Sequence, residues 1–440
     1  MSLSLKIKKG INLNLEGKID DFSSVKEVFP DLVAFVPDDF IGLQLKPELK
    51  EGDSVNAGTP VLRDKADEEI KIVSPVNGTL KAIVRGERRK ILRVEIAPAD
   101  SDTKFRVSDT SDLRLAMANS GLWAMLRQLP YGIVPARDSQ PRDIFVTAID
   151  TAPLAADPCT LCPGRLANAQ AGVEALKSLT KGKVYVGCRP GQLPELHGAE
   201  MVEVEGPHPA GNVGTLVGNI APVNKGEIVW TMDFTLLERI GMLARDGFVD
   251  YGCNVAVTGS EVSKPGIVRT VIGASMKSLV GGNLVRKEHI RVISGNVLTG
   301  SAVGIDGFLR FPYRQVTVIP EGDDKVEFMG WASLSPSKMS FSRSFLGGFL
   351  NRVYNPDARI NGGRRAMIMS GEYESVIPMD IYPEYLIKAI ISKDIDKMEQ
   401  LGIYEVVPED FALAEMIDTS KLPLQRIVRE GLDYIRKETE

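Results

Sequence analysis

The stretch Glu205-Gly-Pro-His-Pro-Ala-Gly-Asn-Val-Gly-Thr215 places three glycines and two prolines around His208, one of only three histidines in the chain. Proline fixes φ and removes a backbone donor, whereas glycine opens conformations that other residues avoid, so the stretch predicts a rigid loop and not a helix. A rigid loop holds an imidazole at a fixed position, which suits proton exchange near neutral pH. The alternative is that His208 only caps a turn beside a strand.

Short apolar strands and helical stretches alternate around this loop. Phe145–Ile149 and Lys183–Val186 are expected strands, and Asn168–Leu179 is an expected helix between them. A further helix is expected at Thr231–Leu243, directly after another short strand. Because strands that alternate with helices form parallel sheets, we expect a doubly wound, Rossmann-like α/β domain over residues 101–250.

The N-terminal segment, residues 1–100, has short alternating strands broken by Gly, Pro and Asn, a pattern typical of all-β structure. Two glycine turns, Glu51-Gly-Asp53 and Gly78-Thr79, are spaced as in the barrel-sandwich domains that carry biotin or lipoate. Lys65 stands between these turns, where a carrier domain presents its modified lysine. Acidic residues at 67–69 replace the symmetric apolar flanks of a carrier lysine, so we expect a structural use of this domain.

The C-terminal half contains two further regions, the first with a strand pattern and the second with a helical pattern. Asn254–Gly259, Val268–Gly273 and Val292–Leu298 are expected strands, and their order resembles the ligand-binding β-grasp module of the flavin subunit of respiratory complex I. We therefore expect a β-grasp module over residues 251–335. Residues 336–440 are expected to form a helical domain. The clearest periodic stretches there are Tyr382–Leu401 and Leu424–Lys437.

Together with Ile220-Ala-Pro-Val-Asn224, the loop around His208 resembles the A subunits of Na+-translocating NADH:quinone reductases, the respiratory sodium pumps of many bacteria. The order of the four predicted regions is also similar to that of the C subunit of the Rnf complex. The resemblance implies a peripheral protein at the cytoplasmic face of the bacterial inner membrane. Such a protein supports quinone reduction coupled to sodium export, while partner subunits carry NADH, flavins, iron centres and sodium.

Two nucleotide-binding features of the more distant relatives are missing. Their glycine-rich loop lets the backbone approach the FMN phosphate, but Gly121–Pro130 carries bulky side chains at this place. Their flavin and nicotinamide pocket has two acidic residues after the next strand, and Pro153 and Ala155 stand at these positions. The resemblance therefore implies a chain that binds no flavin and no NADH in that manner.

The cysteine runs that hold [4Fe–4S] clusters in Rnf-type chains are also missing. Alignment on Val376–Met379 and on Ser420–Pro423 leaves no cysteine at any ligand position. The positions carry Met367, Ser370, Tyr373, Ile377, Pro408, Phe411, Ala414 and Asp418. The resemblance thus implies a helical scaffold without iron sites, and we expect no metal on this chain.

The motif Cys159-Thr-Leu-Cys162 has the spacing of a zinc half-site or a redox dithiol. Zinc needs four ligands, however, and Cys188 and Cys253 each stand alone in the sequence. We favour a structural role for Cys159 and Cys162, and a metal or redox role stays open.

A pocket vacated by flavin would be concave and apolar with a few polar groups, which are the properties of a quinone site. Our candidates for its lining are Trp123 and Tyr131, which can stack on a quinone ring, and Arg127 and Arg137, which can bind its carbonyl oxygens. His208 is the candidate catalytic residue, as proton donor to the reduced quinone. The alternative is that Trp123 is a core residue and the arginines lie on the surface.

Composition limits the remaining function classes. The chain has 440 residues, 43% apolar and 25% charged, which is enough for several domains with cores of their own. A net charge of −5 with dispersed Lys and Arg argues against nucleic acid as a partner. No apolar run reaches the roughly 20 residues of a membrane span, so we expect membrane contact through partner subunits. Two alternatives to a role in quinone reduction are an assembly scaffold without substrate contact and an electron-transfer subunit of the Rnf type.

Overall fold

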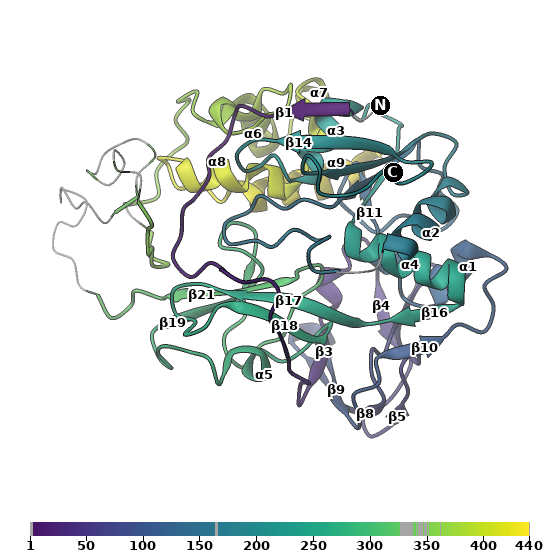
Figure 1. Ribbon diagram of the computed structural model, residues 1–440. Coiled ribbons are helices and arrows are strands. Elements are labelled where there is room, and N and C mark those ends of the chain that lie inside the picture. Colours follow the sequence, from purple (N-terminus) through teal and green to yellow (C-terminus); the bar gives the residue numbers. More distant parts are fainter. Residues whose placement is uncertain are drawn as a thin grey trace.

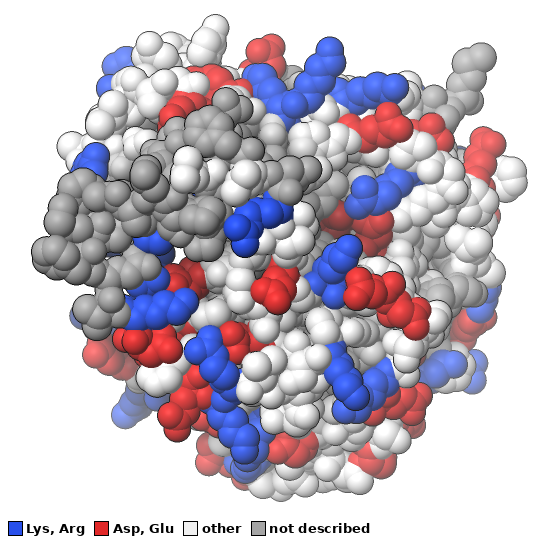
Figure 2. Space-filling view, turned by 60° about the vertical axis from the view of Figure 1, so that its left-hand side comes forward, with Lys and Arg blue, Asp and Glu red and all other residues white. Residues whose placement is uncertain are grey.

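The computed structural model describes residues 3–162, 166–325, 338–339, 341, 346, 350, 352–360 and 362–439. It is a mixed α/β multidomain structure. Figure 1 places the strands β3, β8 and β9 at one end of the molecule, and the strands β1 and β14 with the C-terminal helices at the other. On the face drawn in Figure 2, basic and acidic side chains are interspersed. Among the described residues, no helix has the length and apolar character to cross a membrane.

The N-terminal region contains two small antiparallel sheets, with the orders β3-β9-β8-β5 and β4-β6-β7. Their strands are β3 (Val33–Phe35), β4 (Leu45–Pro47), β5 (Ser54–Val55), β6 (Pro60–Asp64), β7 (Lys71–Val73), β8 (Gly78–Arg85) and β9 (Ile91–Pro98). Val61, Leu80 and Ile96 are fully buried between them. Gly78 allows the close approach of β9, since a Cβ there would lie 2.2 Å from the carbonyl oxygen of Ala97.

The central sheet has the order β1-β14-β13-β12-β15-β11, and all neighbours are parallel except β11 and β15. Its strands are β1 (Leu3–Lys6), β11 (Arg127–Leu129), β12 (Asp143–Thr147), β13 (Val184–Cys188), β14 (Glu200–Glu205) and β15 (Val229–Asp233). The chain order runs from β12 outward through β13 to β14, and then returns to place β15 on the other side of β12. The direction of winding therefore reverses between β12 and β15.

Four helices accompany this sheet. They are α1 (Leu113–Asn119), α2 (Leu166–Lys177), α3 (Val213–Ile220) and α4 (Phe234–Asp246). Helix α4 begins at Asp233, whose side chain accepts the N–H of Leu236, and it ends at Gly247 in the left-handed conformation. Helices α2 and α4 touch through two glycines. A Cβ on Gly241 would lie 1.7 Å from the carbonyl oxygen of Asn168, and one on Gly172 would lie 2.4 Å from that of Leu237.

A third sheet has the order β2-β18-β17-β21-β19-β20, and β10 pairs with β16 beside it. The elements are β2 (Val25–Glu27), β10 (Lys104–Arg106), β16 (Phe248–Asp250), β17 (Gly252–Thr258), β18 (Gly266–Val271), α5 (Met276–Val280), β19 (Ile290–Ser294), β20 (Ser301–Ala302) and β21 (Gln315–Pro320). Strands β1 and β2 thus pair with strands that follow about 200 and about 240 residues later, outside the barrel-sandwich region. The predicted boundary at 335 lies outside the described residues.

The C-terminal region contains α6 (Pro383–Ser392), α7 (Ile395–Gln400), α8 (Ala412–Ile417) and α9 (Leu424–Thr439). Short 3₁₀ helices lie at Pro37–Asp39, Glu87–Arg89, Trp123–Met125, Tyr373–Ser375, Ile403–Glu405 and Pro408–Phe411. Four of the eight positions that carry cysteine in Rnf-type chains are buried in one hydrophobic cluster, namely Tyr373, Ile377, Phe411 and Ala414. Packed hydrophobic side chains therefore occupy four of the positions at which Rnf-type chains carry their cluster cysteines.

Two local predictions were wrong. The stretch around His208 is not free of helix, because α3 begins at Val213. The expected helix from Tyr382 to Leu401 is two helices, since Lys393 adopts the left-handed conformation between α6 and α7.

We predict that Gly241→Ala destabilises the protein by at least about 2 kcal/mol, because the added methyl group collides with backbone atoms of α2 that cannot move independently. Gly282→Ala is the matched control, since nothing lies within 4 Å of a Cβ at this position. Urea unfolding of the two variants measures the difference. Equal unfolding midpoints would contradict the proposed contact between α2 and α4.

Candidate functional site

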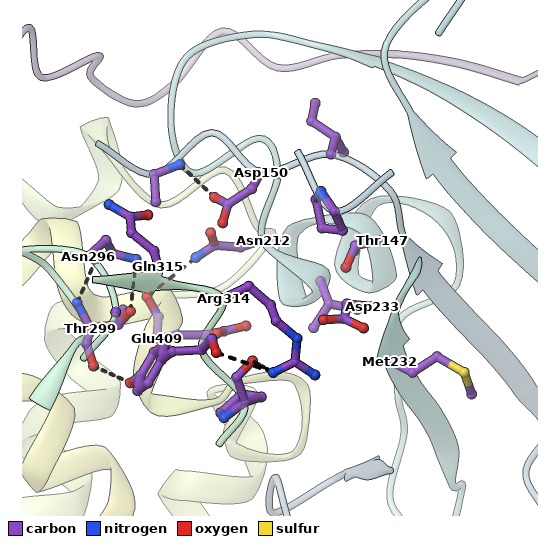
Figure 3. A pocket seen from close by; sticks show the side chains of 18 of the residues that line it. Thr147, Asp150, Asn212, Met232, Asp233, Asn296, Thr299, Arg314, Gln315 and Glu409 are labelled. Carbon is purple, nitrogen blue, oxygen red and sulfur yellow. Dashed lines mark hydrogen bonds between the residues drawn. The ribbon is translucent and has the colours of Figure 1, made fainter. Parts of the chain in front are cut away.

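A cavity of about 260 Å³ lies at the carboxyl ends of β12 and β15, where the winding of the sheet reverses (Figure 3). Open α/β sheets bind their ligands at this place, because the loops after the two strands leave in opposite directions. Thr147 and Asp150 from the β12 side face Met232 and Asp233 from the β15 side. Arg314 and Glu409 close the cavity from the third sheet and from the C-terminal region.

Two carboxyl groups in the cavity hold their protons unusually strongly. Asp150 follows β12 and accepts the N–H of Ala152 at 2.8 Å, and burial raises its pKa to about 6. Burial also raises the pKa of Glu409 to about 7, with a further contribution from the charge of Asp150. Both groups therefore exchange protons near neutral pH, which is the property of a proton donor or acceptor in a reaction.

Asp410, the residue after Glu409, is a third carboxylic acid and lies in the protein interior. Its side chain is 3% exposed, and its Oδ2 accepts the N–H of Val407 at 2.9 Å. Oδ1 has no hydrogen-bond partner within the described part of the chain. Gly214 of α3 makes room for the carboxyl group, because a Cβ there would lie 2.3 Å from Oδ1. Burial, together with the nearby charge of Glu409, raises the pKa of Asp410 well above its usual value.

His208 lies in the cavity wall, as the sequence predicts for a site residue, but it is only 2% exposed. Its Nδ1 lies 3.2 Å from Oγ1 of Thr151, and its Nε2 has no partner among the described residues. The backbone N–H of His208 is held by the side chain of Asn12 at 3.0 Å. Burial lowers its pKa to about 4, so the imidazole is neutral at pH 7. The role of His208 as proton donor stays a prediction, and its pKa in the protein is lower than the unperturbed value on which that role was based.

Arg127 also lines the cavity, and its guanidinium is fixed by backbone carbonyls. It donates to Asp39 at 2.7 Å, to Leu126 at 2.9 Å and to Ala124 at 3.1 Å. The guanidinium lies 4.8 Å from the ring centroid of Phe311, within the range of a cation–π contact. Burial lowers its pKa to about 10, so the group stays charged at neutral pH.

The other predicted quinone-binding residues do not line this cavity. Trp123 is fully buried, and its indole donates to the carbonyl oxygen of Pro135 at 2.9 Å. Tyr131 packs edge-on against Tyr404 with ring centroids 6.1 Å apart. Arg137 forms an ion pair with Asp67 at 2.8 Å. The structure brings together His208 and Arg127, and a quinone role for Trp123, Tyr131 and Arg137 stays a prediction.

In the structure, which describes all four cysteines, Cys159, Cys162, Cys188 and Cys253 form no disulfide. The thiol of Cys159 donates to the carbonyl oxygen of Ala148 at 3.2 Å. Burial raises the pKa of Cys159 to about 11, which disfavours the reactive thiolate. Within the described ranges, no three His, Cys, Asp or Glu side chains gather in a way that could hold a metal ion.

Several cavity residues escaped the sequence reasoning. Asp150 and Asp233 could have been found, because each stands at the carboxyl end of an apolar strand and such ends meet at one edge of a parallel sheet. Arg314 and Glu409 carried no such signal. They come from segments more than 70 residues away from either strand, and only tertiary packing brings them to the cavity.

Comparison with known proteins assigns the family. Three family models match the chain: "NqrA N-terminal barrel-sandwich hybrid domain" at residues 5–99, "NqrA second alpha/beta domain" at 108–249 and "NQRA C-terminal domain" at 254–304. The chain belongs to the NqrA family. Relatives named as the A subunit of Na(+)-translocating NADH-quinone reductase are 36% identical in Neisseria meningitidis, and 35% identical in Pasteurella multocida and in Vibrio anguillarum. Each alignment covers 99% of this chain and 100% of the relative.

These matches confirm the predicted family and the barrel-sandwich domain at the N-terminus. The four predicted domain boundaries stay predictions. Because the NqrA relatives align over their whole length, the cavity and all the segments that enclose it fall within the shared region.

We predict that Glu409→Gln raises the melting temperature at pH 8 and leaves it unchanged near pH 4. The native pKa of Glu409 is about 7, above the usual 4.5, so the group favours folding when protonated and this contribution is lost as the pH rises from about 4.5 to about 7. The amide removes this loss, which is about 3 kcal/mol. Exposed Glu430→Gln is the control. A variant that is equally less stable than wild type at both pH values would contradict the buried acid.

Proposed function

We propose that the chain is a peripheral subunit of a Na+-translocating NADH:quinone reductase and that the cavity at β12 and β15 receives the quinone ring. The observation that carries the proposal is the pairing of an aromatic and apolar wall with carboxyl groups that exchange protons near pH 7. The name of the relatives supports the reaction, since they are NADH-quinone reductase subunits.

The walls of the cavity suit a flat ring with polar edges. Phe311 and Tyr313 come from one side, and Met125, Ile149 and Met232 add apolar surface. Phe311 is held in place, because it lies under the guanidinium of Arg127 and stacks on Phe40 with ring centroids 5.6 Å apart. The volume of about 260 Å³ lies just below the roughly 300–1,000 Å³ of common ligand sites, so it suits a single ring better than a dinucleotide.

The acidic groups supply the protons of the reaction. Reduction of a quinone to a quinol adds two electrons and two protons, one proton to each carbonyl oxygen. In our proposal the electrons arrive from partner subunits, while Asp150 and Glu409 each donate one proton and are reprotonated from solvent. His208 is neutral and contributes an uncharged hydrogen bond to the ring or to the adjacent loop.

The proposal also covers the domain type of the three regions that follow the barrel-sandwich domain. We infer that residues 101–250 derive from a Rossmann-like domain, that residues 251–335 form a β-grasp module, and that residues 336–440 form a helical domain from an iron–sulfur scaffold. The parallel central sheet and the buried Tyr373 and Phe411 support this descent. We also place the protein at the cytoplasmic face of the inner membrane, with NADH, flavins and iron centres on its partners and membrane contact made through them.

A second function, assembly of the complex without substrate contact, is favoured by one surface. At the start of α6, Tyr382 is 65% exposed and Tyr385 is 57% exposed, and their rings lie edge-on with centroids 6.4 Å apart. Large apolar side chains exposed together are typical of surfaces that bind a partner. This surface is compatible with both functions, and kinetics of the assembled complex separates them.

We predict that Asp150→Asn and Glu409→Gln each slow quinone reduction by the assembled complex about 10- to 100-fold, because a positioned proton donor contributes at least this factor. Oxidation of NADH by an artificial electron acceptor should continue, since hydride enters on a partner protein. Exposed Glu430→Gln is the control and should reduce quinone at the wild-type rate.

Equal quinone turnover in all three variants, with normal assembly, would reject the quinone site and leave the scaffold function. Loss of both activities would instead indicate failed assembly. Size-exclusion chromatography of the purified complexes therefore accompanies the kinetics.

A further inference from the structure

A second cavity, of about 250 Å³, adjoins the first, since Leu161 and Arg314 line both. It is enclosed by β2, α4, β17 and β18, and its lining includes Val25 of β2, which is 42% exposed. This strand therefore gives the cavity a route to solvent. Cys162 of the Cys159–Cys162 motif also lines this cavity, and the proposed quinone chemistry does not use it.

Three arginines from different elements meet in its wall. Arg239 belongs to α4, Arg269 to β18, and Arg314 precedes β21. Arg269 is paired with Asp250 at 3.2 Å. Arg239 and Arg314 form no ion pair within the described part of the chain, and the nearby positive charge of Arg239 adds to burial in lowering the pKa of Arg314. Two carboxylates, Glu27 and Glu238, also line the cavity, so three arginines stand against two acids in its lining.

The guanidinium groups of Arg239 and Arg314 each have a nitrogen donor that no described residue accepts. Arg239 is 3% exposed and donates through Nε to Asp250 at 2.9 Å and through Nη2 to Gly252 at 3.1 Å, both backbone oxygens. Its Nη1 has no partner among the described residues, and neither has Nε of Arg314. Buried charged donors are satisfied in folded proteins by an acceptor, so these nitrogen atoms indicate a bound group that carries acceptor oxygens.

The arginines need hydrogen-bond acceptors from a ligand, whereas Asn254 needs a hydrogen-bond donor. It is 9% exposed, and its Nδ2 donates to the carbonyl oxygen of Leu161 at 2.9 Å, which fixes the orientation of the amide. Its Oδ1 is buried without a donor from the described residues. A ligand that satisfies all these groups must combine anionic oxygens with a hydrogen-bond donor. Gly252 leaves room for this arrangement, since a Cβ there would lie 2.6 Å from Nη2 of Arg269.

We propose that this cavity binds a phosphate group that retains one proton, with its anionic oxygens on Arg239, Arg269 and Arg314 and its hydroxyl on Oδ1 of Asn254. Hydrogen phosphate has this chemistry at neutral pH, and a phosphomonoester has it only as its monoanion because its second pKa is about 6, whereas sulfate carries no proton. Because Arg314 lines both cavities, an occupied phosphate site fixes one wall of the neighbouring cavity. The proposal does not depend on quinone binding.

The test is calorimetric titration of the full chain with inorganic phosphate and with sulfate at pH 7. Phosphate should bind at least about tenfold more tightly, because sulfate leaves Oδ1 of Asn254 unsatisfied. Asn254→Ala should abolish this preference, and Arg269→Gln should weaken phosphate binding about tenfold. Arg245→Gln, at the far end of α4 and paired with Asp246, is the control and should bind as wild type. A parallel titration with glycerol phosphate distinguishes a phosphomonoester from free phosphate as the tighter ligand.

A second measurement needs no variant. Cys253 lines this cavity and Cys188 does not, so phosphate should slow alkylation of Cys253 at least threefold and leave Cys188 unchanged. Equal affinity for phosphate and sulfate, unchanged binding in Arg269→Gln, or no protection of Cys253 would each overturn the proposal and identify an adventitious ion only.

Discussion

The reversal of winding between β12 and β15 is the constraint on which the site depends. The chain leaves β12 toward β13 on one side and leaves β15 into α4 on the other, so neither connection covers the crevice between the two strand ends. Distant segments close it instead. Arg314 arrives from the third sheet and Glu409 from the C-terminal region, and the cavity therefore exists only when the separate parts of the molecule are assembled.

Charge is divided unequally between the two cavities. Asp150 and Glu409 line the first cavity together with Arg127, Asp410 follows Glu409 in the chain, and burial raises the pKa of these three acids. Arg239 and Arg269 gather at the second, and Arg314 stands between the two groups. A buried carboxyl group avoids the cost of its charge by taking up a proton, but a buried guanidinium cannot lose its proton at neutral pH. The first cavity is thus suited to proton transfer, and the second to an anion.

Much of the local structure could be predicted from the sequence. The strand at Phe145–Ile149 and the helix at Asn168–Leu179 differ from β12 and α2 by only two residues at each end. Long-range pairing could not be predicted, because β1 and β2 carry no signal for partners about 200 and about 240 residues away. The site was only partly predictable. His208 and Arg127 lie in the cavity, whereas Trp123 has the same apolar pattern whether it packs in a core or faces a ligand, and its contacts with Trp230 and Pro135 place it in the core.

The most direct test of the central claim is a photo-crosslinking map of the assembled complex with a short-tailed quinone that carries the reactive group on its ring. Our account predicts labelled peptides from the loops after β12 and β15 and from the segment around Phe311 to Arg314, with labelling suppressed by excess unlabelled quinone. Labelling confined to other subunits, with these three segments unmodified, would contradict it.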